Sequence, residues 1–348
     1  MKQLWIPHAG DPDVFELRDA PTPEPGPGQV RIQVHAAGVN FADVMARMGV
    51  YDDAPPFPFV VGYEVAGEID AVGPGVDPGR VGEQVLAMTR FGGYSTAVVV
   101  DALQAVPRPP GVDAVTGASI PVTGLTAWMM CEVMGRVRAG DKVLVHSAGG
   151  GVGLMVLDLL RWRGATAYGT ASGHKHAELL ERGYHRLVDY RKEDFEQALA
   201  DVGGFDLIID PVGGESWAKG LRLLAPGGRL ACFGLSATAT GERATWLDRL
   251  RAILAIPWFQ LLVPSLINHN QGVLGVNMGR LWDEGERVTG WLTELLALVA
   301  DGTVRPQVHA AVPFADVAEA HRILHRRENV GKVVLVTEAS VAAGATTG

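Results

Sequence analysis

The first third of the chain contains short runs in which apolar and polar residues alternate. Such runs predict β-strands, and they fall at residues 30–34, 65–72, 84–87 and 94–100. Proline- and glycine-rich stretches, which favour turns, separate these runs at residues 21–27, 55–58 and 73–79. Residues 1–110 are therefore expected to form a β-rich domain.

The pattern changes after Pro121, where helical periodicity begins. A helix is predicted over residues 124–137, and from there apolar runs alternate with amphipathic segments. The runs predict strands at residues 142–146, 165–170, 186–190, 205–210 and 228–234. The segments between them predict helices at residues 152–163, 175–182, 194–202 and 216–224. Alternation of this kind is typical of a parallel, doubly wound sheet.

The last part of the chain completes both predicted domains. Residues 273–277 are expected to add a sixth strand at the sheet edge, and a helix follows over 287–300. The run at 332–336 predicts a strand that returns to the first domain, because the parallel sheet is already complete. Residues after Val336 offer little apolar surface and are expected to be disordered. The predicted parts are a β-rich domain (1–123 and 279–340), a nucleotide-binding domain (124–278) and a disordered tail (341–348).

A glycine-rich turn joins the first strand of the parallel sheet to its helix. Residues 142–153 read Lys-Val-Leu-Val-His-Ser-Ala-Gly-Gly-Gly-Val-Gly, with small residues at Ala148, Gly150 and Gly153. In a dinucleotide-binding turn the first position permits a tight bend, the second lets the backbone approach a pyrophosphate, and the third lets helix and strand pack closely. Backbone N–H groups at the helix start then receive the anion. The chain is therefore expected to bind a dinucleotide.

Composition narrows the class of protein. The chain has 348 residues and a net charge of −9 with no long basic run, which argues against nucleic acid as a partner. Its two cysteines, Cys131 and Cys232, lie in apolar segments and exclude a disulfide framework or a cysteine-rich zinc site. A reducing cytoplasm is the expected location. The most apolar stretch, residues 252–267, contains two prolines and is shorter than the roughly 20 residues of a membrane-spanning helix.

Six segments occur in the order typical of the medium-chain dehydrogenase/reductase superfamily, which the chain resembles over residues 1–336. They are Ala-Gly-Val-Asn-Phe-Ala-Asp (37–43), Val-Gly-Tyr-Glu-Val-Ala-Gly (61–67), Val-Thr-Gly-Leu-Thr-Ala (122–127), Ala-Gly-Gly-Gly-Val-Gly (148–153), Asp-Pro-Val-Gly-Gly (210–214) and Asn-Val-Gly-Lys-Val-Val-Leu (329–335). The resemblance implies an α/β protein with a GroES-like β-rich catalytic domain and a Rossmann domain. Within the superfamily the chain looks most like the zinc-free quinone oxidoreductase group and its synaptic-vesicle amine-transport-protein branch. Segments 40–47, 169–176 and 219–224, with a long insertion near 237–270, favour that branch.

The chain departs from the zinc-dependent members at the metal ligands. Asn40 stands where those enzymes place a cysteine, Tyr63 stands where they place a histidine, and the four-cysteine lobe is missing. These positions are therefore not expected to hold a tetrahedral zinc. His321 and His325 are four residues apart but lack a third ligand nearby, so they are expected on a solvated helix face.

The second strand of the parallel sheet indicates which nicotinamide cofactor is bound. An NAD site carries an acid about 20 residues past the glycine turn, and none is present here. Ser172 and Lys175 follow that strand instead, and a hydroxyl with a cation suits a 2′-phosphate. The resemblance implies that Tyr190 completes this cradle, so NADPH is the expected cofactor. The predicted cofactor-binding residues are Thr126, Ala148, Gly149, Gly150, Gly151, Val152, Gly153, Ser172, Lys175, Tyr190, Phe233, Asn277 and Asn329.

Four residues are candidates for the chemistry: Asn40, Asp43, Tyr51 and Tyr63. The resemblance implies that Asn40 and Asp43 face the nicotinamide and that the tyrosines border the same cleft. Either tyrosine is an acid that could protonate a product oxygen, or it is a loop anchor bonded to backbone. Thr126 likewise resembles the family threonine beside the nicotinamide, or it caps a helix start.

These residues predict an NADPH-dependent, zinc-independent reductase that transfers hydride to a quinone or an α,β-unsaturated carbonyl. The alternative is a cofactor-binding, transport-associated or regulatory protein with weak catalysis. A homodimer is expected, because the predicted edge strand at 273–277 would otherwise expose apolar backbone. The insertion at 237–270 is open to three interpretations: a wall for a bulky apolar substrate, a dimer contact or a membrane-surface patch. Membrane contact is the least favoured, because basic residues there are few.

Overall fold

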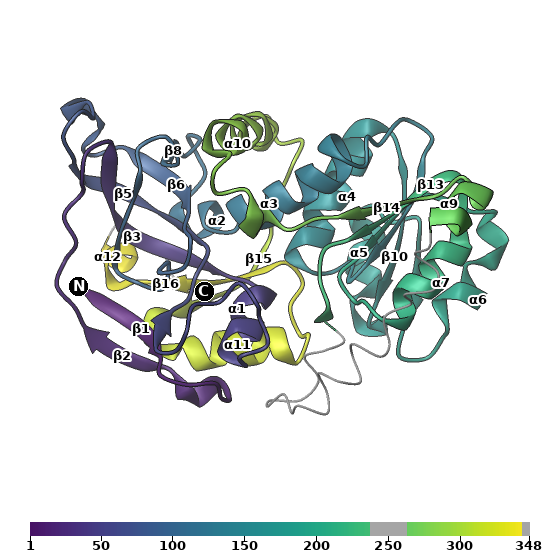
Figure 1. Ribbon diagram of the computed structural model, residues 1–348, viewed down its shortest axis with the longest axis horizontal. Helices are drawn as coiled ribbons and strands as arrows, with labels where there is room; N and C mark the ends of the chain where they lie inside the picture. The colour runs from purple at the N-terminus through teal and green to yellow at the C-terminus, as the bar shows by residue number, and fades with distance from the viewer. Residues whose placement is uncertain (237–262, 343–348) are drawn as a thin grey trace. The chain divides into compact units, whose positions relative to one another are not determined.

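The computed structural model describes residues 1–236 and 263–342, and the chain folds into two compact units (Figure 1). Unit 1 comprises Met1–Leu125 and Met278–Gly348, and unit 2 comprises Thr126–Asn277. The predicted insertion near 237–270 therefore lies largely outside the described residues, as does the end of the tail at 343–348. Within the described residues, no helix is both long and apolar enough to cross a membrane.

Unit 1 is built on β-sheets, as the alternating pattern predicts. A seven-stranded sheet runs in the order β15-β16-β3-β5-β6-β8, with β7 paired to β3 off this path. Its strands are β3 (Gln29–Val39), β5 (Glu64–Val72), β6 (Gln84–Met88), β7 (Ala97–Asp101), β8 (Val106–Pro107), β15 (Val308–Pro313) and β16 (Lys332–Val336). A second sheet contains β1 (Lys2–Ile6), β2 (Glu16–Asp19) and β4 (Phe59–Val60).

The final strand returns to the first domain, as predicted. β16 pairs antiparallel with β3, with Val333 opposite Val39 and Leu335 opposite Ala37. All five residues of β16 are buried, so this strand forms part of the unit 1 core rather than its surface. The strand predicted over 94–100 begins later, at Ala97, because Tyr94 turns inward and lies buried beside α1 and α11.

The helices of unit 1 fill the space around these sheets. They are α1 (Phe41–Arg47), α2 (Ala114–Gly117), α10 (Gly285–Ala300), α11 (Val317–His325) and α12 (Glu338–Ala342), and α3 (Pro121–Trp128) begins in this unit. Short 3₁₀ turns occur at Pro12–Val14, Pro78–Arg80, Met278–Arg280 and Phe314–Asp316.

Two sequence expectations are wrong in this unit. His321 is fully buried on α11 rather than solvated, because Phe15 and Tyr94, from distant parts of the chain, pack against its ring. The chain after Val336 is also ordered as far as residue 342, because Thr337 is buried and its hydroxyl donates a 2.7 Å hydrogen bond to the carbonyl of Val34. The residues that follow form α12.

Unit 2 is the predicted parallel sheet. Its six strands run in the order β11-β10-β9-β12-β13-β14, and every adjacent pair is parallel. They are β9 (Lys142–His146), β10 (Thr166–Ala171), β11 (Arg186–Asp189), β12 (Phe205–Asp210), β13 (Leu224–Cys232) and β14 (Gly272–Gly275). The chain reverses its direction of winding between β9 and β12, and ligands of such sheets bind at the carboxyl ends of strands at this point.

Helices connect these strands, and their apolar sides pack on the sheet. They are α4 (Gly151–Arg163), α5 (His176–Arg182), α6 (Phe195–Ala198), α7 (Glu215–Leu223) and α9 (Val263–His269), with 3₁₀ turns at Gly173–Lys175 and Ala200–Val202. The buried cluster includes Leu144, Phe205 and Ile208. The helix predicted over 124–137 instead starts at Pro121 and continues as a π-helical turn over Met129–Val133.

Candidate functional site

The glycine-rich turn of unit 2 has the close packing that its sequence predicts. It leaves β9 at Ser147, whose φ of 56° is unusual for a residue with a side chain, and enters α4 with Gly150 as the N-cap. A Cβ atom on Gly153 would lie 2.6 Å from the carbonyl oxygen of Ala148, so only glycine fits there. A Cβ on Gly150 would meet only the Ser147 carbonyl oxygen, at 3.3 Å. The backbone at Gly150 is therefore open to the approach of a ligand.

Ser172, Lys175 and Tyr190 gather beside this turn. The hydroxyl oxygens of Ser172 and Tyr190 are 3.2 Å apart, although the two residues come from the ends of β10 and β11. Lys175 is 7% exposed, and a Cβ on Gly149 would lie 3.2 Å from its Cδ atom. The lysine stem thus rests on the glycine turn, while Tyr190 is 37% exposed. These groups form a hydroxyl- and cation-rich cradle at the carboxyl edge of the sheet.

Asp189 is an acid at this cradle that the sequence analysis missed. It ends β11, and its Oδ2 atom would lie 2.6 Å from a Cβ on Gly173. Burial disfavours its charge, but backbone hydrogen bonds from Arg191 and Gly173 outweigh burial and lower its pKa. Because these N–H groups engage the carboxylate, Asp189 fixes the turn that carries Ser172 and Lys175. Its place at the end of the third strand is the signal that could have identified it.

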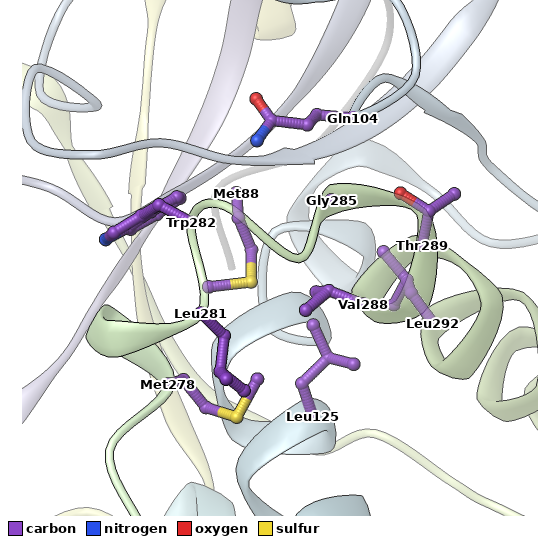
Figure 2. A pocket seen from close by; sticks show the side chains of 10 residues that line it. All are labelled: Met88, Gln104, Leu125, Met278, Leu281, Trp282, Gly285, Val288, Thr289 and Leu292. Atoms are coloured by element: carbon purple, nitrogen blue, oxygen red, sulfur yellow. The ribbon is translucent and has the colours of Figure 1, made fainter.

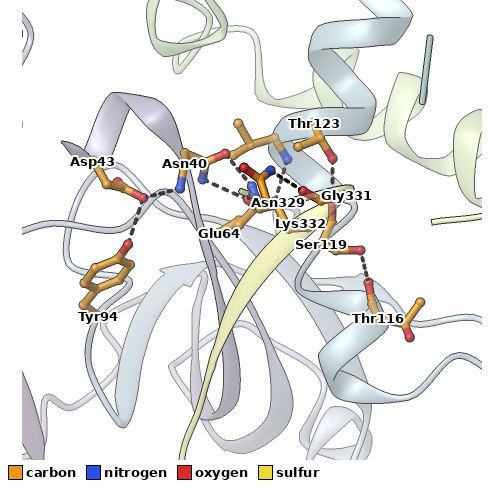
Figure 3. A network of polar contacts seen from close by, with 11 residues as sticks. Asn40, Asp43, Glu64, Tyr94, Thr116, Ser119, Thr123, Asn329, Gly331 and Lys332 are labelled. Carbon is orange, nitrogen blue, oxygen red and sulfur yellow. Dashed lines mark hydrogen bonds and ion pairs between the residues drawn. The ribbon is translucent and has the colours of Figure 1, made fainter. Parts of the chain in front are cut away.

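The remaining predicted cofactor residues are spread over both units. Phe233 and Asn277 follow β13 and β14 in unit 2. Thr126 is 8% exposed in the interior of α3, so the alternative that it caps a helix start is wrong. Asn329 lies in unit 1, where its Nδ2 atom donates to the carbonyl oxygen of Gly331 at 2.7 Å (Figure 3).

Unit 1 contains a buried network around Glu64 (Figure 3). The Asn40 Nδ2 atom donates to Glu64 Oε1 at 2.9 Å, and the Lys332 ammonium donates to Asn40 Oδ1 at 2.5 Å. The same ammonium lies 2.5 Å from Glu64 Oε1, and the N–H of Val122 in the first turn of α3 donates to Glu64 Oε2 at 2.8 Å. A Cβ on Gly38 would lie 2.4 Å from Glu64, so the network needs a glycine there. The Asn40 amide is thus held at both of its ends.

Asp43 joins this network at the start of α1. Its Oδ2 atom accepts hydrogen bonds from the Asn40 N–H at 2.7 Å and from the Tyr94 hydroxyl at 3.0 Å. Its side chain is fully buried, and burial raises its pKa to about 7 despite these hydrogen bonds and the charge of Lys332. The Tyr94 hydroxyl also lies 3.4 Å from Nε2 of His321. Asp43 is therefore a buried carboxyl group that holds the Asn40 backbone and the Tyr94 hydroxyl.

Tyr51 and Tyr63 form an aromatic pair in the same unit. Their ring centroids are 6.2 Å apart in an edge-to-face arrangement, and Phe91 packs on Tyr63 at 5.0 Å. Burial raises the pKa of both hydroxyls, with the nearby Tyr51 hydroxyl adding to the effect on Tyr63. The Tyr63 hydroxyl makes no hydrogen bond of ordinary length within the described residues. Burial therefore keeps both hydroxyls protonated, and the Tyr63 hydroxyl interacts with that of Tyr51.

The residues at the family's metal-ligand positions do not fit a zinc ion. Asn40 is bonded to Lys332 and Glu64, and Tyr63 packs among aromatic rings. The Lys332 ammonium already supplies the positive charge beside Glu64. In residues 1–236 and 263–342, no three His, Cys, Asp or Glu side chains gather in a way that could hold a metal. Zinc prefers thiolate and imidazole ligands, which these positions lack.

A small apolar cavity lies in unit 1 near this network (Figure 2). Met88, which lines it, pairs with Glu64 across strands β5 and β6. The thioether groups of Met88 and Met278 and the ring of Trp282 surround it, and unbranched methionines adapt to varied apolar shapes. The other lining residues are Gln104, Leu125, Leu281, Gly285, Val288, Thr289 and Leu292.

Comparison with known proteins identifies the families and proteins that this chain resembles. A model described as alcohol dehydrogenase GroES-like domain matches residues 26–110, and one described as zinc-binding dehydrogenase matches residues 182–335. The rat synaptic vesicle membrane protein VAT-1 homolog is 38% identical over 327 residues, which cover 92% of this chain and 80% of that protein. A quinone oxidoreductase of Pseudomonas aeruginosa is 30% identical over 341 residues, covering 96% of this chain and 99% of that protein.

Among solved structures, a mycobacterial protein complexed with NADPH has the same fold. Its TM-score is 0.81 at 30% sequence identity, and the match covers 97% of this chain and 99% of that one. A protein whose structure contains NADPH thus shares the fold of this chain over nearly its whole length.

Proposed function

The chain belongs to the medium-chain dehydrogenase/reductase superfamily, in its quinone oxidoreductase-like group, and we propose that it is an NADPH-dependent, zinc-independent reductase. Its substrates would be quinones or α,β-unsaturated carbonyl compounds. The observation that carries this proposal is the Lys332–Glu64–Asn40 network, because it fixes the amide of Asn40 at a metal-ligand position of the superfamily and places a protein ammonium group beside it.

The cradle in unit 2 supports NADPH as the cofactor. Ser172 and Tyr190 offer hydroxyl donors and Lys175 offers a cation, which together suit a 2′-phosphate. Asp189, the acid at the end of β11, already accepts backbone hydrogen bonds from Arg191 and Gly173. One similar protein of known structure has NADPH bound. When bound here, NADPH would supply the hydride.

The residues of unit 1 would orient the acceptor and handle its proton. A quinone or enone carbon is electrophilic without a metal, so hydrogen bonds to the acceptor oxygen are enough to polarise it. Tyr63 and Tyr51 are the proposed donors, because burial keeps both hydroxyls protonated. Asn40 has a second amide hydrogen beyond the one that Glu64 accepts, and Asp43 holds the Asn40 backbone in place.

Unactivated alcohols are not proposed as substrates. An alcohol must lose its proton before it gives up hydride, and a Lewis-acid metal is the usual means. The network around Glu64 offers no ligand set for such an ion.

A homodimer in the cytoplasm is the proposed state of the protein. β14 is the edge strand of the described six-stranded sheet, and its residues are at least partly exposed. An unpaired apolar edge favours pairing with another chain, and a second copy would extend the sheet through β14. Sedimentation at micromolar concentration tests this proposal, and a monomer would contradict it.

A second function is a cofactor-binding role with weak catalysis. The similarity to a protein named for the synaptic vesicle membrane favours it. NADPH oxidation by the purified protein, assayed with a panel of quinones and enones and with a chelator present, separates the two functions. Turnover supports the reductase, and NADPH binding without turnover supports the second function.

A further inference from the structure

The Tyr184 side chain contacts the glycine-rich turn. It belongs neither to the glycine motif nor to the cradle formed by Ser172, Lys175 and Tyr190. It lies between α5 and β11 and is 3% exposed. Its hydroxyl lies 3.0 Å from the carbonyl oxygen of Gly153 and 3.4 Å from that of Ala148. These two carbonyls belong to the last and first small residues of the motif. One phenolic hydrogen is thus shared between the two ends of the turn.

The ring of Tyr184 is enclosed where it meets the turn. A Cβ on Gly169 would lie 2.7 Å from Ala148 Cβ and 3.0 Å from Tyr184 Cε1, so Gly169 leaves the room that both need. Burial also raises the pKa of the Tyr184 hydroxyl, which stays protonated and acts as a donor. Only glycine at position 169 accommodates this arrangement.

Holding a carbonyl also aims the N–H that follows it. In a trans peptide the C=O of one residue and the N–H of the next point in opposite directions. A hydrogen bond from Tyr184 to the Ala148 carbonyl therefore turns the Gly149 N–H away from the tyrosine. The Lys175 side chain packs against the same Gly149. The Ala148–Gly149 peptide is thus contacted by both side chains.

We propose that Tyr184 is a positioning residue for the dinucleotide pyrophosphate: its hydroxyl holds the Ala148 and Gly153 carbonyls so that the Gly149 N–H meets the anion. This inference rests on the proposed cofactor binding. It assigns Tyr184 to the pyrophosphate and leaves the 2′-phosphate to Ser172, Lys175 and Tyr190. The two subsites are therefore separable by substitution.

The test compares Tyr184→Phe with a matched control, Tyr168→Phe. Tyr168 is buried in the same unit against Phe205 and His185, and its hydroxyl has no hydrogen bond to residues 1–236 or 263–342. Dissociation constants are measured for NADPH, NADH and adenosine 2′-monophosphate, which has no pyrophosphate. Tyr184→Phe is expected to weaken NADPH and NADH by the same factor, about 3- to 10-fold, as the loss of one hydrogen bond predicts. Adenosine 2′-monophosphate should bind unchanged, and Tyr168→Phe should leave all three ligands unchanged.

Two results would overturn the assignment. One is that Tyr184→Phe binds both dinucleotides like the wild type, and the other is that it weakens adenosine 2′-monophosphate equally, which indicates general distortion. If Tyr184→Phe does not fold, the amide resonance of Gly149 in the wild type decides: ADP-ribose should shift it more than adenosine 2′-monophosphate does. A resonance that ADP-ribose leaves unmoved refutes the role of Tyr184. A wild type that binds neither dinucleotide refutes the proposed function and this inference together.

Discussion

The ammonium nitrogen of Lys332 lies 2.5 Å from Oε1 of Glu64, with 4% and 0% of the two side chains exposed. The two residues come from β16 and β5, and β3 lies between these strands in the sheet. Removing the lysine would leave the Glu64 carboxylate buried without its counter-charge, which is far more costly than losing a surface ion pair.

Lys332→Met is therefore expected to lower the free energy of unfolding by about 3–5 kcal/mol, measured by denaturant titration. The control is Lys2→Met, because Lys2 pairs with Asp19 at 2.8 Å on the surface and its loss should destabilise the fold far less than the loss of Lys332. The double variant Lys332→Met/Glu64→Gln should be more stable than Lys332→Met alone. Equal costs for the two lysines would contradict the account.

The raised pKa of Asp43 predicts how the free energy of unfolding depends on pH. Burial raises its pKa in the folded protein to about 7, above the ordinary value of about 4. The folded state therefore binds this proton more tightly than the unfolded chain does. The resulting stabilisation is complete below about pH 4 and is lost as the pH rises through about 7. Unfolding titrations of the wild type and Asp43→Asn across this range should differ in slope, and parallel profiles would show that Asp43 does not titrate there.

The proposed contact of Lys175 with the 2′-phosphate predicts that the protein prefers NADPH to NADH. A charge-assisted hydrogen bond contributes roughly 1.5–3 kcal/mol, so Lys175→Ala should weaken NADPH about 10- to 100-fold. NADH lacks the 2′-phosphate and should bind almost unchanged. Dissociation constants from fluorescence titration check this prediction. Equal losses of affinity for both cofactors would show that Lys175 does not bind the 2′-phosphate.

The sequence predicted the parts of the structure that local pattern determines. The alternating strands and helices of unit 2 follow from short-range periodicity, and the return of β16 follows because the parallel sheet is complete without it. The glycine turn was recognisable because each small residue answers to a local steric demand, as the crowding around Gly153 shows.

Contacts between distant residues were not predictable in the same way. The hydrogen bond between Asn40 and Lys332 spans 292 positions, and the burial of His321 depends on Tyr94, which is 227 positions away. Helical periodicity places His321 on a face of α11 but does not say what packs there. Tyr184 was missed for a related reason: its contact with the turn depends on the space that Gly169 leaves beside Ala148.

Tyr51 and Tyr63 are the proposed sources of the proton that the acceptor oxygen takes up. If general acid catalysis matters, Tyr→Phe at the true donor should lower the turnover rate by about 10²- to 10⁴-fold without weakening NADPH binding. Rates are measured for the two single variants beside the wild type. If both variants keep the full rate, the proton comes from solvent and neither tyrosine is the acid.

The most direct test of the central claim is the consumption of NADPH by the purified wild-type protein with a quinone or an enone, in the presence of a metal chelator. If the protein has the proposed reductase function, NADPH is oxidised steadily, the chelator does not slow the reaction, and simple alcohols give no comparable activity. NADPH that binds normally but is not consumed with any quinone or enone, or turnover that stops when the chelator is added, would contradict it.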